Sequence, residues 1–276
     1  MFIFKKSLGQ HFLKSEEAVL DIVHAADIRT DDIVIEIGPG EGVMTESLIS
    51  LAGKVIAFEK DHRLIPVLQE KFKKEIKSGK FELHKKDILE FDPDLCTPSV
   101  HKFKIVANIP YYITGKLLRK FLETKHQPES ITLLLQKEVA ERIVAKDGKE
   151  NLLSLSVKAY GQPKYIKTVP AKAFRPEPKV DSAILHIKNI SRLNFEMLDE
   201  KMFFKILHAG FAHKRKLFFS NLKNLPTLGV GKYKKEDLAK TFEKWGINLK
   251  SRAEDIPLEM WIKLCQSFFS LKKEIQ

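Results

Sequence analysis

A glycine-rich turn between an apolar segment and a helix places the strongest constraint on the fold of this chain. Residues 33–37 have the composition of a buried strand, and the loop 38–42 that follows carries glycine at every second position. Glycine permits backbone conformations and close approaches that other residues do not. The helix expected at 43–51 presents free amide groups at its start. We therefore predict a strand–loop–helix unit in which the backbone approaches a ligand closely.

An acidic residue at the end of the next predicted strand extends this pattern. Glu59 lies 21 positions after Gly38. A carboxylate about 20 residues beyond such a loop commonly accepts hydrogen bonds from ribose hydroxyls. The order Glu36-x-Gly38-x-Gly40-x-Gly42 differs from the Gly-x-Gly-x-x-Gly of dinucleotide sites and favours S-adenosylmethionine as the adenosine-bearing cofactor. The alternative is a structural glycine turn beside an unrelated surface glutamate.

Strand and helix patterns alternate as far as about residue 160. Strands are expected at 54–58, 81–84, 103–107 and 131–136, then at 165–169 and 182–187, and helices at 61–76, 114–122, 137–145 and 152–160. This alternation predicts an α/β doubly wound sheet, in which ligands lie outside the carboxyl ends of the strands. Gly38, Glu59, Asp87 and Asn108 all fall at such ends, so we expect them to share one site. Taken alone, Asp87 fits a turn or a helix cap equally well.

The tetrapeptide Asn108-Ile109-Pro110-Tyr111 follows the predicted central strand. Pro110 has no amide hydrogen and fixes its own φ, so the strand ends there with carbonyl groups left at its end. Asn108 adds a side-chain acceptor, and Tyr111 adds an aromatic face. Acceptors beside an aromatic plane suit a planar amine such as the exocyclic group of adenine. An ordinary strand-to-helix turn is the alternative, because asparagine and proline are common in turns.

Two other stretches are candidates for the same site. Residues 174–182 contain two prolines that stiffen the loop, so Phe174 can hold its ring over a pocket. Burial of Phe174 beneath the loop is an equal alternative. Near the N-terminus, His11 and Leu13 combine a polar and an apolar group after the bend that Gly9 permits. An arm that only packs through its apolar residues is the alternative there.

The C-terminal part of the chain differs in charge from the rest. Residues 192–276 hold 17 Lys and Arg against 10 Asp and Glu, so they carry a net +7 of the +12 of the whole chain. Helices are expected near 199–211, 214–223, 235–245 and 256–270. The basic cluster Lys214-Arg215-Lys216 is either a solvated face or a surface that contacts phosphate. We predict two domains, residues 1–190 and residues 191–276.

Composition excludes several other classes of protein. The hydrophobic content of 43% supports a packed core, and no apolar run reaches the length of a membrane span. The apolar start of the chain is too short for a signal peptide, so a cytoplasmic location is expected. Cys96 and Cys265 lie far apart, form no metal-ligand cluster, and are expected to be free thiols.

Taken together, these motifs resemble the ribosomal RNA adenine dimethyltransferases of the KsgA type. The resemblance covers nearly the whole chain, including the C-terminal stretch 211–216. One departure is His11, where the family often has asparagine. The resemblance implies a seven-stranded class I methyltransferase sheet followed by a small all-helical domain that binds RNA.

The resemblance also implies a reaction and roles for the residues. Members of the family transfer methyl groups from S-adenosylmethionine to the N6 amines of two adjacent adenosines near the 3′ end of small-subunit ribosomal RNA. It implies that cofactor binding involves the residues His11, Leu13, Gly38, Gly40, Glu59, Asp87 and Asn108. It implies that the target base is held by Asn108, Pro110, Tyr111 and Phe174.

The expected partner is small-subunit ribosomal RNA in a pre-ribosomal particle, with a monomeric protein and a role in ribosome biogenesis. No metal and no membrane contact are expected. Two alternatives stay open: a large-subunit rRNA adenine methyltransferase that confers antibiotic resistance, and a non-catalytic RNA-binding assembly factor.

Overall fold

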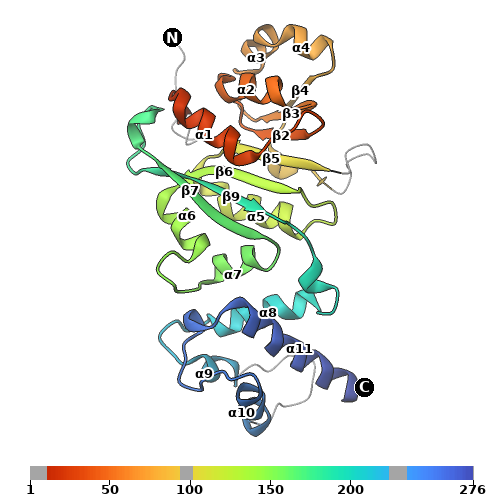
Figure 1. The fold of residues 1–276 in the computed structure, drawn as a ribbon, viewed down its shortest axis with the longest axis vertical. Helices are drawn as coiled ribbons and strands as arrows, with labels where there is room; N and C mark the ends of the chain where they lie inside the picture. The colour runs from red at the N-terminus through yellow and green to blue at the C-terminus, as the bar shows by residue number, and fades with distance from the viewer. Residues whose placement is uncertain (1–10, 94–101, 224–234, 276) are drawn as a thin grey trace. The chain divides into compact units, whose positions relative to one another are not determined.

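The computed structural model describes residues 11–93, 102–223 and 235–275 and contains one seven-stranded mixed sheet (Figure 1). Its strand order is β4-β3-β2-β5-β6-β9-β7. The strands are β2 (Ile33–Ile37), β3 (Lys54–Glu59), β4 (Phe81–Lys85), β5 (Phe103–Asn108), β6 (Ser130–Gln136), β7 (Gln162–Val169) and β9 (Ser182–Lys188). Neighbouring strands from β4 to β6 are parallel, and β9 is antiparallel to both β6 and β7. The predicted doubly wound α/β class is confirmed.

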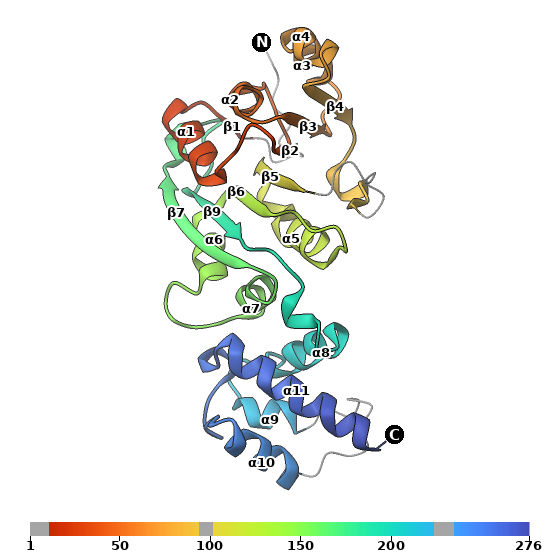
Figure 2. The same ribbon diagram turned by 45° about the vertical axis from the view of Figure 1, so that its right-hand side comes forward.

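Helices cover both faces of this sheet. Helix α1 (Glu16–Ala26) lies against β5, β6, β7 and β9, and α5 (Thr114–Glu123) lies on the opposite side of the sheet (Figures 1 and 2). The Ser15 hydroxyl caps α1 by accepting a hydrogen bond from the amide of Ala18 at 3.2 Å. Helix α2 (Val43–Leu51) follows β2 after the glycine loop 38–42. Because both faces are covered, the central strands consist almost entirely of buried residues.

Two helix predictions are wrong in extent. The helix expected at 61–76 is split into α3 (Ile65–Lys71) and α4 (Lys73–Lys77), because Pro66 favours a helix start and Phe72 leaves helical geometry. The helix expected at 214–223 is only α9 (Phe218–Leu222), so the basic cluster 214–216 precedes the helix. Strand β7 begins earlier than expected and includes Pro163, which is tolerated because β7 is an edge strand.

A second, two-stranded sheet joins distant parts of the chain and was not predicted. Strand β1 (Phe12–Leu13) pairs antiparallel with β8 (Phe174–Arg175), and Leu13 lies opposite Phe174. The side chain of Phe174 is only 2% exposed and belongs to the hydrophobic core that packs α1 and α2 against the sheet. This pairing attaches the N-terminal segment to the loop that precedes β9.

By its contacts the chain divides into two compact units. The first contains residues 1–140 and 161–190, and the second contains residues 141–160 and 191–276. Helix α6 (Lys137–Val144) spans a boundary, and α7 (Leu152–Lys158) belongs to the second unit. The other helices of the second unit are α8 (Glu200–Gly210), α9, α10 (Lys235–Lys244) and α11 (Leu258–Ile275).

Trp261 is the centre of the helical core in the second unit. Its ring is fully buried, with its centroid 4.5 Å from that of Phe218, and its indole N–H donates to the carbonyl of Ile256 at 3.0 Å. A methyl group added at Gly210 would lie 2.3 Å from the Trp261 ring, so only glycine lets α8 approach this closely.

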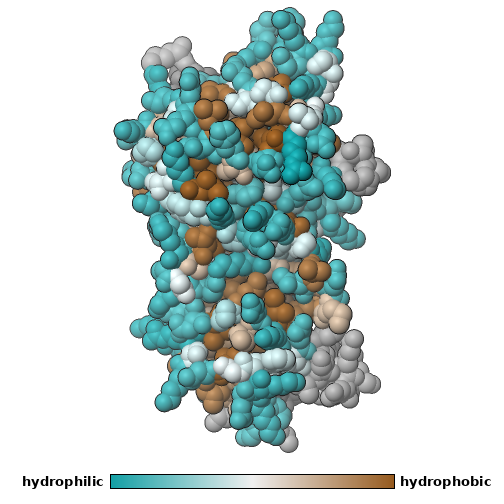
Figure 3. Space-filling model, viewed as in Figure 1, coloured by the Kyte–Doolittle hydropathy of each residue, from teal (hydrophilic) through white to brown (hydrophobic). Residues whose placement is uncertain are grey.

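The surface of both units is predominantly hydrophilic on the face drawn in Figure 3. Among the described residues, no helix has the length and apolar character that crossing a membrane requires. Cys265 is a buried free thiol, as expected, and Cys96 lies outside the described residues.

Phe174→Ala tests the burial of Phe174. Removing a buried phenylalanine from a packed core costs about 3–5 kcal/mol, so the melting temperature should fall by several degrees without any ligand. Phe174→Leu fills most of the space and should lose much less. An unchanged melting temperature for Phe174→Ala, measured by thermal unfolding, would contradict the buried placement.

Candidate functional site

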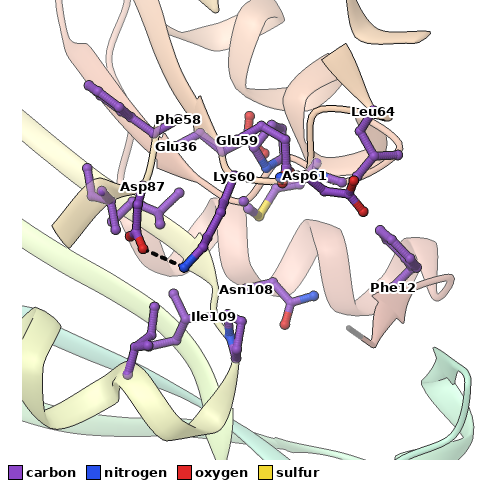
Figure 4. A pocket seen from close by; sticks show the side chains of 18 of the residues that line it. Phe12, Glu36, Phe58, Glu59, Lys60, Asp61, Leu64, Asp87, Asn108 and Ile109 are labelled. Carbon is purple, nitrogen blue, oxygen red and sulfur yellow. Dashed lines mark hydrogen bonds and ion pairs between the residues drawn. The ribbon is translucent and has the colours of Figure 1, made fainter. Parts of the chain in front are cut away.

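A cavity of about 330 Å³ lies at the carboxyl ends of β2, β3, β4 and β5. The residues that give it its chemistry are Phe12, Glu36, Gly38, Gly40, Glu59, Lys60, Asp87 and Asn108 (Figure 4). Side chains from the ends of β3 and β4 lie on one side of the cavity, and Asn108 and Ile109 lie on the other. The site that the strand pattern predicted is therefore assembled where parallel strands end.

The glycine loop forms the wall under the cavity. Gly38, Gly40 and Gly42 have φ values of 70°, 61° and 77°, which is the left-handed region that favours glycine. A methyl group at Gly40 would lie 2.8 Å from the ring of Phe12, and one at Gly42 would lie 2.6 Å from the ring of Phe72. The loop thus needs glycine both for its conformation and for the two aromatic rings that pack against it.

The Glu59 carboxylate is the last group of β3 and is held by backbone amides. Its Oε2 accepts from the amide of Gly40 at 3.2 Å, and its Oε1 accepts from the amide of Asp61 at 2.7 Å. Burial raises its pKa above the usual value, although these hydrogen bonds oppose the shift. A carboxylate offers about four lone pairs, so the oriented group can still accept from a ligand.

Glu36 is a second carboxylate in the cavity wall and is fully buried within β2. The hydroxyl of Thr45 donates to its Oε2 at 2.7 Å, and its Oε1 has no hydrogen-bond partner among the described residues. Burial, together with the nearby charge of Glu59, raises the pKa of Glu36 to about 8, against the opposing effect of Thr45. This side chain is thus protonated at neutral pH in the structure described.

Asp87 lies at the end of β4 and serves as a helix cap. Its Oδ1 accepts from the amide of Leu89 at 3.0 Å, and its Oδ2 pairs with Lys60 Nζ at 2.8 Å (Figure 4). Burial opposes ionisation, but the hydrogen bonds from Lys60 and Leu89 outweigh it and hold the pKa of Asp87 below its usual value. The carboxylate is therefore ionised at the edge of the cavity.

Asn108 ends β5 with its amide orientation fixed. Its Nδ2 donates to the backbone carbonyl of His11 at 3.1 Å, and the ring Nδ1 of His11 is 2.7 Å from the carbonyl of Pro176. Because the amide nitrogen is used in this way, the side-chain oxygen of Asn108 is left as an acceptor. The carbonyl of Pro110 accepts from the amide of Ile113 at 3.2 Å and keeps one lone pair.

The structure brings most of the predicted site residues together. His11, Leu13 and Pro110 line the cavity along with the glycines, the carboxylates and Asn108. Phe174 lies in the core and does not line this cavity, so its stacking on a base stays a prediction. The backbone of Tyr111 begins the short helix Tyr111–Ile113, and its side chain lies outside the described part of the chain. Residues 214–216 are exposed on the second unit.

Sequence reasoning missed three contributors to the cavity. Phe12 packs on Gly40, Lys60 neutralises Asp87, and Glu36 places an incompletely hydrogen-bonded carboxyl group in the wall. The order Glu-x-Gly-x-Gly-x-Gly marked Glu36 as part of a motif but did not reveal its burial. Phe12 and Lys60 carried no signal, because their contacts cross between distant segments.

Comparisons with known proteins place the chain in a family. A family model described as "Ribosomal RNA adenine dimethylase" matches residues 1–269. The chain belongs to this family. A relative from Dehalococcoides mccartyi, "Ribosomal RNA small subunit methyltransferase A", is 44% identical over 96% of this chain and 88% of its own length. A protein of the same name from Clostridium acetobutylicum is 36% identical over 97% of this chain and 95% of its own.

Solved structures agree on the fold of this dimethylase-family chain. A dimethyladenosine transferase from Plasmodium falciparum superposes with a TM-score of 0.78 at 26% identity, covering 95% of this chain and 98% of that one. The 23S rRNA methyltransferase ErmE matches with a TM-score of 0.73 at 24% identity, and the match covers 94% of this chain and 99% of ErmE. The methyltransferase fold with a helical C-terminal region is thereby confirmed.

Glu36→Gln tests the protonation of the buried carboxyl group. Between about pH 4.5 and pH 8 the unfolded carboxyl group loses its proton while the folded one keeps it, so this group makes the protein less stable as pH rises. Glutamine does not titrate, so the variant should gain melting temperature relative to the unmodified protein between pH 5 and pH 9. If the melting temperatures of the two proteins, measured without ligand, changed in parallel with pH over that range, the protonation of Glu36 would be contradicted.

Proposed function

We infer that the protein is an S-adenosylmethionine-dependent rRNA (adenine-N6,N6)-dimethyltransferase. It dimethylates two adjacent adenosines near the 3′ end of small-subunit ribosomal RNA. Membership of the ribosomal RNA adenine dimethylase family supports this function. Relatives named "Ribosomal RNA small subunit methyltransferase A", at 36–44% identity, support it as well. The observation that carries the residue-level proposal is Asn108, whose amide nitrogen is bound to His11 and whose oxygen remains for a substrate amine.

The residues of the cavity fit S-adenosylmethionine. Gly38 and Gly40 line the cavity with backbone that carries no side chain, so a ligand can approach it closely. The carboxylates suit a ligand with ribose hydroxyls and positive charge. In this proposal Gly38 and Gly40 lie along the cofactor, Glu59 accepts from the ribose and Asp87 from the adenine amine. His11 and Leu13 close the methionine end. When bound, the cofactor supplies an activated methyl group on a positively charged sulfur.

The protein's own contribution is alignment of the target amine. The Asn108 side-chain oxygen and the carbonyls of Ile109 and Pro110 accept from the N6 amine and direct its lone pair toward the methyl group. Tyr111 and Phe174 stack on the extruded base, which for Phe174 requires its ring to leave the core. The amine loses its proton after attack, so no residue is assigned as a general base.

The proposed partner is ribosomal RNA in an assembling small subunit. The helical second domain, residues 191–276, supplies affinity for phosphates through Lys214, Arg215 and Lys216, which are all exposed. A monomeric protein acting in the cytoplasm during ribosome biogenesis belongs to the same proposal. The names of the relatives favour small-subunit RNA over large-subunit RNA as the substrate.

Asn108→Ala tests the proposed reaction. Loss of the acceptor removes alignment in the transition state, so single-turnover methylation of unmethylated small subunits should fall at least a hundredfold. Cofactor affinity should weaken only modestly. Gln136→Ala is a matched control, because Gln136 is an amide at the end of neighbouring strand β6 outside the cavity. Near-normal transfer of a labelled methyl group by Asn108→Ala would overturn the role of this residue.

Replacing Lys214, Arg215 and Lys216 together with alanine tests the RNA surface. Three lost phosphate contacts should reduce the slope of log affinity against log salt by roughly two to three. Cofactor affinity, measured by calorimetry, should not change. Alanine at the exposed residues Lys73, Lys74 and Lys77 removes the same charge from the other unit and serves as the control. Equal salt slopes for the two triple variants would show that residues 214–216 face solvent.

A further inference from the structure

Glu36 is the buried group that the proposed reaction leaves without a role. Its side chain is fully buried in β2, and the residue is one of those that line the cavity. Its Oε1 has no hydrogen-bond partner within the described residues. A carboxylate buried in this way is costly unless it is protonated or paired with a positive charge.

The surroundings of Glu36 contain no positive charge that could serve as this partner within the described structure. In the sheet register its neighbours are Ala57 on β3 and Val106 on β5, which do not titrate. From α2, Thr45 donates its hydroxyl to Oε2. From the end of β3, the negative charge of Glu59 acts on Glu36 and raises its pKa. The wall around Glu36 therefore favours the neutral carboxyl group as long as no cation enters the cavity.

We propose that Glu36 carries a proton in the ligand-free protein and releases it to solvent when a cationic ligand occupies the cavity. The identity of that ligand, S-adenosylmethionine, rests on the proposed function. The O–H bond of the carboxyl group breaks, the proton passes to water, and the negative charge stays in the wall facing the bound cation. Glu36 is thus a positioning residue that adapts the charge of the cavity to that of its ligand.

The linkage gives cofactor affinity a defined pH dependence. Below about pH 8, where the ligand-free carboxyl group is protonated, affinity should rise by up to tenfold per pH unit. Above that pH the group is ionised before binding, so its contribution to the dependence should disappear. Because binding releases the proton of Glu36, the ligand and that proton oppose each other's binding. The same carboxyl group destabilises the ligand-free protein at high pH.

Calorimetric titration of the full chain with S-adenosylmethionine measures the released proton directly. Binding heats in two buffers of different ionisation enthalpy at pH 7 give the number of protons released per ligand. The unmodified protein should release nearly one proton more than Glu36→Gln, and the difference should vanish at pH 9.5. The amine of the ligand titrates in both titrations and cancels in the difference. Equal proton numbers for the two proteins would overturn the proposal.

Thr45 provides an independent variant that keeps Glu36. Its hydrogen bond lowers the pKa of Glu36, so Thr45→Val should raise that pKa and increase proton release at pH 8.5. Thr45→Ser keeps the hydroxyl and should match the unmodified protein. Identical release by Thr45→Val and the unmodified protein would overturn the proposal. Binding without linked protons leaves the proposed function intact, whereas no binding at all overturns both.

Discussion

The cavity depends on the close packing of the glycine loop between two aromatic rings. Phe12 lies where a side chain at Gly40 would lie, and Phe72 does the same at Gly42. The loop held in this way directs the amide of Gly40 at Glu59. A local sequence motif is thus converted into a rigid wall by residues from the N-terminal segment and from the region just after α3.

The N-terminal segment connects the two halves of the site. Strand β1 pairs with β8, the His11 ring contacts the carbonyl of Pro176, and the His11 carbonyl accepts from Asn108. The orientation of the amide that is proposed to grip the target amine is therefore set by backbone from a distant part of the chain. In the proposed reaction, residues 11–13 therefore contribute to alignment of the target amine through Asn108.

The electrostatics of the cavity follow from unequal burial of similar groups. Asp87 is paired with exposed Lys60 and is ionised, whereas Glu36 is enclosed by apolar strands and is protonated. Glu59 lies between these extremes, buried but held by amides. Carboxyl groups in one cavity thus differ in charge state, so the cavity can accommodate a change in ligand charge by moving a proton.

Local features of the amino-acid sequence suffice to predict the class of fold and the strand ends that form the site. Apolar runs separated by helical patterns are local features, and so are the glycine order and the proline after Asn108. Gly38, Glu59, Asp87 and Asn108 could therefore be placed in advance. The folded structure was needed to show that Phe174 is buried, that β1 pairs with β8, and that Glu36 Oε1 has no hydrogen-bond partner among the described residues. Each of these depends on contacts between segments far apart in the chain, and burial and pairing of that kind leave no periodic signal in the sequence around one residue.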